Sequence, residues 1–449
     1  MDGMTIRKAA EACGGMLCGA GDFERELGSA VIDSRAVRPG DLFAAFRGEH
    51  VDGHEYIGAA FDRGAACCLA ERVPEGEMRP VIVVRDVQKA LERIAEAYRA
   101  TLNIPVIGVT GSVGKTTAKE MITAVLSQRL RVLKTEGNFN NQIGVPMTVS
   151  RIRRGDEAAV IEMGISGFGE MWELATVARP TAAVYTLIGS AHLEFLHDRD
   201  GVMRAKGEML EEMSRFDPVF VNGDDDKLRA LNCRQEKTLF GLGEHNDVRA
   251  EQIRSLPGGH TACEIVAGGR RIPVEIPAFG QHMVYAALAG AAVGLHFGLS
   301  DAEIAAGIAS YETVGRRGAV IDTGCLTLID DCYNANPDSC RSGIDSLLSL
   351  PGRHVCIFSD MLELGEGAPA MHAQIGRYAK ERGVELTLCC GPLSAETARA
   401  ADGLYYVNQD ALIADLPQRL RHGDAVLVKA SRGMKLEKVS EAVKKLELE

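Results

Sequence analysis

A buried strand that runs straight into a glycine-rich turn and a helix is the feature that most constrains the fold of this chain. Residues 103–110, NIPVIGVT, form the apolar run expected of a parallel strand covered on both faces. Residues 110–117, TGSVGKTT, follow at once, and the pattern predicts a helix over 118–130. Strands that alternate with helices form sheets covered by helices on both sides. The pattern therefore predicts an α/β fold with a doubly wound sheet.

The glycine-rich turn also predicts a phosphate-binding site. Backbone N–H groups and the helix dipole at such a turn hold phosphate. Lys115 would neutralise the terminal phosphates, and the Thr116 hydroxyl would bind Mg²⁺. The turn is shorter than the general P-loop pattern, because Val109 and not glycine stands five residues before Gly114. A glycine-rich turn with an exposed lysine is the structural alternative. The residues expected to bind ATP here are Gly111, Ser112, Val113, Gly114, Lys115, Thr116 and Thr117.

The rest of the chain continues the α/β pattern. Apolar runs at 158–162, 182–187 and 218–221 each lie beside a plausible helix, as in a doubly wound sheet. Residues 245–277 carry short β-like runs between Gly and Pro, which predicts an antiparallel excursion. A new α/β pattern begins near residue 315. We therefore expect three domains, over residues 1–100, 101–315 and 316–449, with boundaries placed to within several residues.

Composition narrows the class of protein. The chain has 449 residues and a formal net charge of −12, so its overall field repels nucleic acid, and an anionic substrate would need a local basic pocket. No apolar run of about 18 residues is present, so no membrane insertion is expected. Residues 1–21 are acidic in part and lack a long apolar stretch, which argues against a secretory signal. The twelve cysteines form no CxxC pair, which favours reduced thiols in a cytoplasmic protein.

The short P-loop resembles that of the Mur ligases and the folylpolyglutamate synthetases, and further segments resemble Mur ligases in the same order along the chain. The most discriminating is Asp330-Asp-Cys-Tyr-Asn-Ala-Asn-Pro337. The other matching segments are 33–35, 40–43, 52–54, 138–146, 161–164, 190–194, 205–208, 315–316, 360–365, His372 and 429–433. The resemblance implies a three-domain Mur ligase. It would have a small α/β N-terminal domain for the UDP substrate, a central P-loop ATPase-like domain and a Rossmann-like C-terminal domain.

Several residues acquire expected roles from this resemblance. Lys115, His192 and Lys206 would be catalytic. Glu162 would bind Mg²⁺ together with Thr116, His192 would serve the metal and phosphate position, and Lys206 would be carbamylated and become a further metal ligand. The residues expected to contact nucleotide outside the P-loop are Arg316 and Asp331. The residues expected to bind substrates are Ser34, Arg35, Asn140, Asn141, Tyr333, Asn334 and Asn336.

The resemblance also implies an activity in peptidoglycan precursor synthesis, and with it a role in cell shape and division. A monomer would join D-alanyl-D-alanine to UDP-N-acetylmuramoyl-tripeptide, with ATP and Mg²⁺ as cofactors. Transfer of the γ-phosphoryl group to the substrate carboxylate would make an acyl phosphate, which the amine of the dipeptide then attacks. Whether the third residue of the tripeptide is diaminopimelate or lysine stays open.

Two alternatives also stay open. One is another Mur-type ligase or a folylpolyglutamate ligase. The other is a nucleotide-binding regulatory protein without ligase activity, because Met283 and Ala286 stand where family members usually have asparagine. Asparagine offers donors and an acceptor to a purine edge, whereas Met offers a thioether and Ala nothing polar. How this chain would read adenine is therefore an open question at the sequence level.

Overall fold

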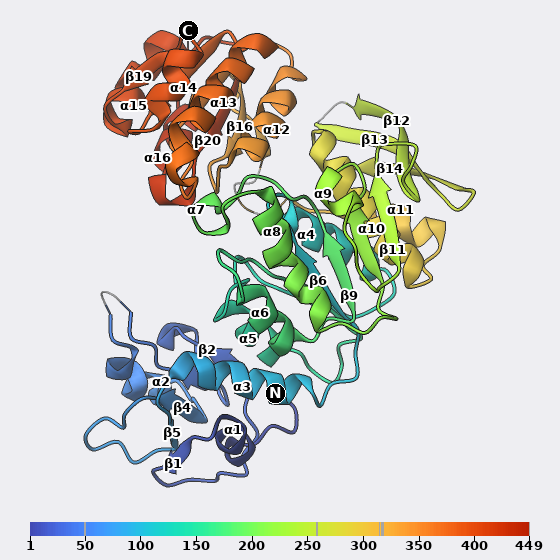
Figure 1. Ribbon diagram of the computed structural model, residues 1–449. Helices are drawn as coiled ribbons and strands as arrows, with labels where there is room; N and C mark the ends of the chain where they lie inside the picture. The colour runs from blue at the N-terminus through green and yellow to red at the C-terminus, as the bar shows by residue number, and fades with distance from the viewer. Residues whose placement is uncertain (49–50, 257–258, 314, 316–317, 449) are drawn as a thin grey trace.

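The computed structural model describes residues 1–449 except 49–50, 257–258, 314, 316–317 and 449. Its strands form three sheets, with five, nine and six strands. In Figure 1 the N-terminal part lies at the bottom in blue, the central part carries the P-loop, and the C-terminal part lies at the upper left in orange and red. The three-part α/β architecture predicted from the sequence is confirmed.

The N-terminal part is a small α/β unit. Its sheet has the order β1-β5-β4-β3-β2, with β1 antiparallel to β5 and the other neighbours parallel. Its helices and strands are α1 (Ile6–Cys13), β1 (Met16–Cys18), β2 (Ala30–Val31), β3 (Leu42–Ala44), α2 (Ile57–Asp62), β4 (Cys67–Ala70), β5 (Val81–Val83) and α3 (Val87–Arg99).

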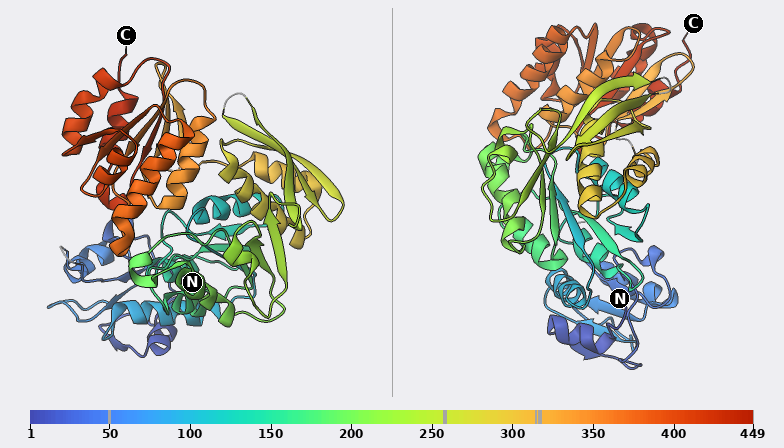
Figure 2. Two further views of the ribbon diagram at one scale, coloured as in Figure 1. Left: turned by 45° about the horizontal axis from the view of Figure 1, so that its top comes forward. Right: turned by 90° about the vertical axis from the view of Figure 1, so that its right-hand side faces the viewer.

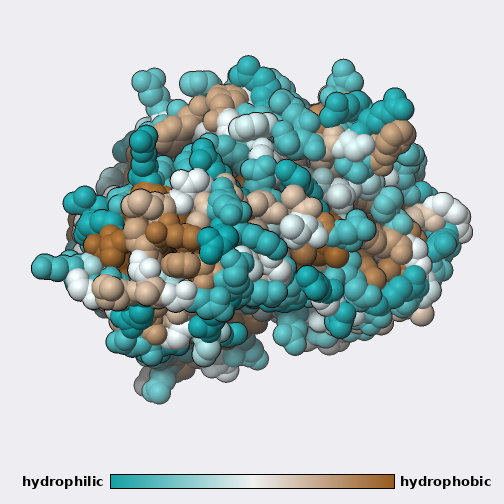
Figure 3. All heavy atoms as spheres, turned by 90° about the horizontal axis from the view of Figure 1, so that it is seen from below, coloured by the Kyte–Doolittle hydropathy of each residue, from teal (hydrophilic) through white to brown (hydrophobic). Residues whose placement is uncertain are grey.

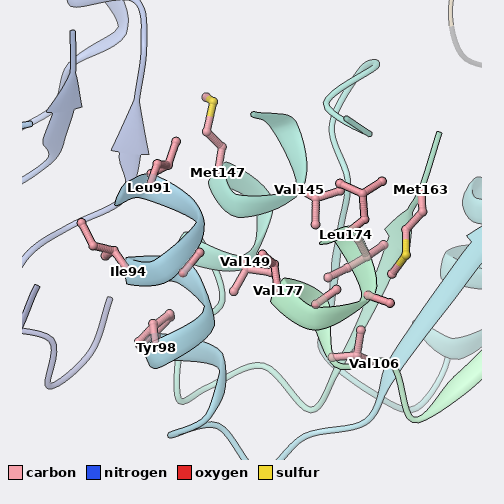
Figure 4. Packing of buried hydrophobic residues seen from close by; sticks show 14 of the residues in the cluster. Leu91, Ile94, Tyr98, Val106, Val145, Met147, Val149, Met163, Leu174 and Val177 are labelled. Atoms are coloured by element: carbon pink, nitrogen blue, oxygen red, sulfur yellow. The ribbon is translucent and has the colours of Figure 1, made fainter. Parts of the chain in front are cut away.

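Helix α3 joins this part to the central one. Asp86 caps its first turn by accepting a hydrogen bond from the Lys89 backbone N–H at 2.9 Å. The buried side chains of Leu91, Ile94 and Tyr98 recur at helical spacing, and Figure 4 shows them beside apolar residues of α5 (Gly144–Ser150) and α6 (Glu170–Ala178). Residues of both parts belong to a single hydrophobic core. The N-terminal and central parts are therefore held together by shared apolar burial.

The central part contains the nine-stranded sheet, ordered β14-β13-β12-β11-β10-β9-β6-β8-β7. Its strands are β6 (Val106–Thr110), β7 (Val132–Lys134), β8 (Ala158–Glu162), β9 (Ala182–Tyr185), β10 (Val219–Asn222), β11 (Lys237–Gly241), β12 (Val248–Leu256), β13 (His260–Ala267) and β14 (Arg270–Ile276). Besides α5 and α6, its helices are α4 (Lys115–Leu126), α7 (Leu193–Leu196), α8 (Arg199–Gly207), α9 (Asp226–Arg229), α10 (Gln281–His296) and α11 (Asp301–Ala309).

Strand β6 lies at the point where the order of this sheet reverses. It pairs in parallel with β8 on one side and with β9 on the other. The chain fills the β8 side first and then returns to fill the β9 side. Ligands of open α/β sheets bind beyond the carboxyl ends of the strands at such a switch point. The turn after β6 is therefore where the fold itself favours a ligand site.

The antiparallel excursion predicted over 245–277 is confirmed. Strands β12, β13 and β14 pair antiparallel and extend the otherwise parallel sheet beyond β11. They form the projecting ribbon at the upper right of Figure 1. Pro273 lies in β14, at the edge of the sheet, where a missing backbone donor is tolerated.

The C-terminal part is a six-stranded sheet in the order β15-β16-β20-β17-β18-β19. Only β15 runs antiparallel to its neighbour, and the remaining pairs are parallel. Its helices and strands are β15 (Ala319–Asp322), β16 (Thr327–Asp331), α12 (Pro337–Leu348), β17 (His354–Phe358), α13 (Ala368–Arg382), β18 (Leu386–Cys390), α14 (Ser394–Ala400), β19 (Leu404–Tyr406), α15 (Gln409–Arg419), β20 (Ala425–Lys429) and α16 (Glu437–Lys444).

One face of the molecule is seen in a space-filling view. The face seen from below in Figure 3 is mostly hydrophilic, with small separate apolar patches. Among the described residues, none of the helices combines the length and the apolar character needed to span a bilayer.

Candidate active site

The glycine-rich turn lies between β6 and α4, as predicted, and it requires glycine. Gly111 has a φ of +150° and Gly114 a φ of +84°. A Cβ atom on Gly111 would lie 2.0 Å from the Thr186 hydroxyl oxygen, which itself donates a hydrogen bond to the Val113 carbonyl at 2.6 Å. The loop is therefore packed against the segment after β9, and a side chain at Gly111 would force it open.

The first turn of α4 faces this loop. Gly114 at the helix N-cap has no side chain to bind the first backbone N–H groups, which leaves them suited to an anion. The Lys115 ammonium group folds back over the loop and donates to the Gly111 carbonyl at 2.7 Å. This arrangement places a cation and a helix N-terminus at one point, as a triphosphate would require.

Glu162, at the end of β8, is brought next to the P-loop. Its side chain is buried, the Thr116 hydroxyl donates to its Oε2 at 2.8 Å, and the Asn140 amide donates to its Oε1 at 2.7 Å. Three predicted site residues from separate segments thus form one contact network. Because the Thr116 hydroxyl gives its proton to Glu162, the lone pairs of its oxygen remain available to a cation.

Two buried residues of this network were not predicted from the sequence. Lys119 donates to the Thr135 carbonyl at 2.7 Å, and its ammonium nitrogen lies 3.9 Å from Glu162 Oε2. The Thr135 hydroxyl oxygen accepts a hydrogen bond from the Glu162 backbone N–H at 3.0 Å. A signal was available, since Lys119 and Glu120 are charged residues in a helix whose neighbours are mostly apolar.

Lys206 lies in α8 with 1% of its surface exposed. Burial, and to a smaller degree the charge of Lys115, lowers the pKa of Lys206 well below its ordinary value, while Glu170 acts in the opposite direction. The Tyr185 hydroxyl donates to the Lys206 backbone carbonyl at 3.1 Å and fixes this turn of the helix. A lysine on an amphipathic helix is ordinarily exposed to solvent, whereas Lys206 is buried.

His192 precedes α7 in the left-handed conformation, with a φ of +56°, which is uncommon for residues other than glycine. Its Nδ1 lies 2.6 Å from Glu363 Oε2 in the C-terminal part. The neighbouring imidazole lowers the pKa of Glu363. This nitrogen is therefore engaged by a carboxylate from another part of the chain.

Two further contacts bring the C-terminal part against the same loop. The Ser190 backbone N–H donates to Asp338 Oδ2 at 2.7 Å, and the Glu194 backbone N–H donates to the Glu363 carbonyl at 3.4 Å. Both views of Figure 2 show the C-terminal part approaching the segment around α7. The candidate site is thus bordered by two parts of the chain, so its geometry depends on how they meet.

On the C-terminal side, Asp331 forms an ion pair with the buried Lys429, which also donates to the Asn334 carbonyl at 3.0 Å. The Arg432 guanidinium stacks over the Tyr333 ring, 5.0 Å from its centroid. An open cavity of about 640 Å³ adjoins this stack and is lined by Arg432, Gly433, Lys435, Glu437 and Lys438. Arg432, Lys435 and Lys438 form no ion pair with another described residue, which leaves a local excess of positive charge.

Other predicted residues have structural partners. Asn141 accepts from the Gly144 N–H at 2.9 Å, and Asn336 caps α12 by accepting from the Ser339 N–H at 2.8 Å. Ser34 is buried in the N-terminal part, while Arg35 is exposed and forms a bidentate pair with Asp33. Arg316 lies outside the described residues.

The two positions at which this chain lacks the asparagines of the family lie in a packed helix, α10. Met283 is 4% exposed and Ala286 is 5% exposed, and both belong to the core between α10 and the central sheet. The burial of both positions favours the interpretation that they pack and that adenine is read elsewhere.

The oxygen groups at the P-loop fit Mg²⁺. The Thr116 hydroxyl and the Glu162 carboxylate are hard oxygen donors that lie together. Within the part of the chain that the structure describes, no three His, Cys, Asp or Glu residues are arranged to hold a metal alone. Mg²⁺ commonly takes one or two protein ligands and completes its shell with phosphate and water. The donor set therefore suits a cation that arrives with a nucleotide.

Comparison with known proteins covers almost the whole chain. Three family models match it: "Mur ligase family, catalytic domain" at residues 29–99, "Mur ligase middle domain" at 109–294, and "Mur ligase, glutamate ligase domain" at 316–432. A Bacillus subtilis protein named UDP-N-acetylmuramoyl-tripeptide–D-alanyl-D-alanine ligase is 36% identical over 97% of each chain.

Two solved structures agree with the matches to the family models and to the Bacillus subtilis relative. A crystal structure of MurF from Acinetobacter baumannii has a TM-score of 0.88 and 28% identity, covering 98% of this chain and 99% of that one. The MurF ligase from Thermotoga maritima, solved in complex with ADP, has a TM-score of 0.83 and 30% identity, covering 93% and 97%.

Proposed function

This chain belongs to the Mur ligase family, and from that premise we propose that it joins D-alanyl-D-alanine to UDP-N-acetylmuramoyl-tripeptide with ATP and Mg²⁺. The observation that carries the proposal is the full-length match to ligases of that name, in a chain whose P-loop, Glu162 and C-terminal part meet at one site. Relatives carrying this name favour the activity over the folylpolyglutamate alternative and over a regulator without activity. The product belongs to peptidoglycan precursor synthesis.

The reaction forms an amide bond in two steps. The substrate carboxylate attacks the γ-phosphorus of ATP, which yields an acyl phosphate and ADP. The amine of the dipeptide then attacks the acyl carbon, the C–O bond to phosphate breaks, and the ammonium proton is lost. Catalysis of the first step is mostly positioning and charge neutralisation, because two anions must meet.

The P-loop residues supply this neutralisation in our proposal. The N–H groups at the start of α4 and the Lys115 ammonium group hold the triphosphate. Thr116 and Glu162 would hold Mg²⁺, which when bound offsets the charge between triphosphate and carboxylate. His192 would join this site once its nitrogen is released from Glu363. Asp331 and Arg316 would contact the nucleotide when the C-terminal part closes.

We further propose that Lys206 is carbamylated. Its lowered pKa favours the neutral amine, whose nitrogen lone pair can attack CO₂. A nitrogen–carbon bond forms, one proton leaves, and the side chain becomes an anion with two oxygens. That anion would suit a second Mg²⁺ where an ammonium group could not.

The substrates would lie on opposite sides of this centre. Ser34 and Arg35 of the N-terminal part would contact the UDP group. Tyr333, Asn334 and the basic cavity beside Arg432 would receive the dipeptide, whose terminal carboxylate needs a cation. Asn140, already bound to Glu162, would meet the reacting end of the tripeptide.

The division into domains 1–100, 101–315 and 316–449 and a cytoplasmic location are also part of the proposal. Each of the three sheets falls within one of these ranges. All twelve cysteines are free thiols, as is usual in a reducing compartment.

A phosphate-release assay tests the function. We expect release when ATP, Mg²⁺, UDP-N-acetylmuramoyl-tripeptide and D-alanyl-D-alanine are all present, with a product mass equal to the joined substrates less one water. Each omission should reduce the rate to background. Running lysine and diaminopimelate tripeptides side by side identifies the third residue. Phosphate release without the ligated product would contradict the proposal.

A further inference from the structure

Lys119 is a buried charge beside the phosphate site. It lies on α4, one helical turn after Lys115, and its side chain is 0% exposed. Lysine is almost never fully buried unless it is paired. Neither the P-loop pattern nor the steps described above uses it, so its presence beside Glu162 needs a separate explanation.

The ammonium group of Lys119 lies between two carboxylates. Its nitrogen is 2.9 Å from Glu120 Oε1 and 3.9 Å from Glu162 Oε2, and it donates to the Thr135 carbonyl at 2.7 Å. Glu120 also pairs through its other oxygen with Lys134. Positive and negative groups therefore alternate from Lys134 through Glu120 and Lys119 to Glu162.

The same contacts define where the Glu162 carboxylate lies. Thr135 binds both Lys119, through its carbonyl, and the Glu162 backbone N–H, through its hydroxyl. Thr116 and Asn140 each donate to one oxygen of the carboxylate. The Lys119 ammonium group lies at a distance from this carboxylate where unit charges interact strongly in a buried setting.

We propose that Lys119 is a positioning residue for phosphoryl transfer, because its ammonium group acts as the resident counter-ion of Glu162 and weakens the attraction of that carboxylate for Mg²⁺. A buried carboxylate without such a partner would hold Mg²⁺ and its nucleotide too tightly for the product to leave. The inference rests on the proposed function only in naming Mg²⁺ with an adenine nucleotide as the ligand.

The full-length protein and its Lys119→Met variant provide the test. Met keeps the length of the side chain and removes the charge. We measure binding of a fluorescent ADP analogue against Mg²⁺ concentration, and we expect half-saturation at about tenfold lower Mg²⁺ in the variant. We also expect a slower release of the analogue. Half-saturation at equal or higher Mg²⁺ would overturn the proposal.

Two other variants separate charge from packing. Glu120→Gln removes the competing partner of Lys119, so the ammonium group acts on Glu162 alone and half-saturation should move to higher Mg²⁺. A shift in the same direction as Lys119→Met would contradict the proposal. Lys134→Met, a matched control whose side chain is 41% exposed and pairs with the same Glu120, should change the Mg²⁺ dependence less.

The Glu120→Gln result decides the proposal if Lys119→Met does not fold. Because binding is measured without the muramoyl substrate or the dipeptide, a failed ligation assay would not affect the outcome. The opposite outcome is also possible to recognise. If the wild-type enzyme ligates normally and all three variants keep its Mg²⁺ dependence, the proposed role of Lys119 is wrong and the proposed function stands.

Discussion

Lys115 is the residue on which we expect the nucleotide chemistry to depend most. Its ammonium group lies over the P-loop, where it donates to the Gly111 carbonyl, so its removal should weaken the binding of phosphate more than the folding of the chain. We expect Lys115→Ala to lower kcat by about 10²–10³-fold, the loss typical for one preorganised charged or hydrogen-bonding group. Thermal unfolding should stay close to that of the wild type. Near-wild-type kinetics would reject the P-loop assignment.

At Lys206, the modification can be observed directly. We expect a carbamate carbon signal when the protein is equilibrated with ¹³C-labelled bicarbonate, and none in Lys206→Ala. This variant should lose most of its activity, and formate or acetate should restore part of it by filling the vacated ligand space. Activity of Lys206→Ala equal to that of the wild type would argue against a carbamate in the reaction.

The positive cavity beside Tyr333 leads to a prediction about the dipeptide. If Arg432 binds the terminal carboxylate, D-alanyl-D-alanine should have a KM about 10- to 100-fold below that of D-alanyl-D-alaninamide, as expected for a charged hydrogen bond. Arg432→Ala should abolish this preference and leave the KM for ATP unchanged. Lys445→Ala, exposed on the same side of the domain but outside the cavity, serves as the matched control. A preference that survives Arg432→Ala would exclude the arginine.

At the scale of single elements, α10 shows how packing limits which side chains can contact a ligand. Met283 and Ala286 are buried against the central sheet, so they contribute apolar contacts. We expect Met283→Asn to lower the free energy of unfolding by about 1–3 kcal/mol, since it places an amide in an apolar core. The preference for ATP over GTP, measured by competition, should not change. A marked gain in ATP selectivity would show that this position does read the base.

Among the elements of the central part, a buried strand followed from the sequence, whereas the start of a helix did not. The apolar run 158–162 coincides with β8, because a strand buried on both faces has to be apolar throughout. The helix expected over 118–130 begins at Lys115 instead, since Gly114 allows the turn that starts it. The antiparallel β15 was not foreseen, because it is short and only half-buried.

At the scale of the whole molecule, α3 makes the N-terminal part depend on the central one. Leu91, Ile94 and Tyr98 are buried with residues of α5 and α6 (Figure 4). Exposing each would cost about 1.5–3 kcal/mol, and together they rival the stability of a small domain. We expect residues 1–100 alone to unfold without cooperativity and to bind UDP weakly. A fragment of residues 1–315 should show a cooperative transition in urea.

The unfolding of the two fragments would show whether the N-terminal part shares a hydrophobic core with the central part or is only linked to it by the chain. Circular dichroism and urea unfolding of both fragments provide the measurement, and Tyr98→Ala in the full-length chain is the matched substitution. A cooperative transition in residues 1–100 equal to that of the longer fragment would show that the shared packing contributes little.

The sequence by itself determined the α/β class, the P-loop and the family. These features depend on local patterns, namely apolar runs, the glycine-rich turn and the order of short segments along the chain, so no long-range contact is needed to recognise them. The proposal that the Thr116 hydroxyl binds a cation also depends on such a local pattern, since the place of Thr116 in the loop defines its surroundings.

The tertiary structure alone decided the environment of the charged residues. Lys206 and Lys119 are buried because distant segments pack against their helices. The contact of His192 with Glu363 joins residues 171 positions apart, and the P-loop network gathers α4, β8 and the loop at Asn140. The pKa of a side chain, its partners and the field at a metal site depend on such long-range contacts, which local sequence patterns do not specify.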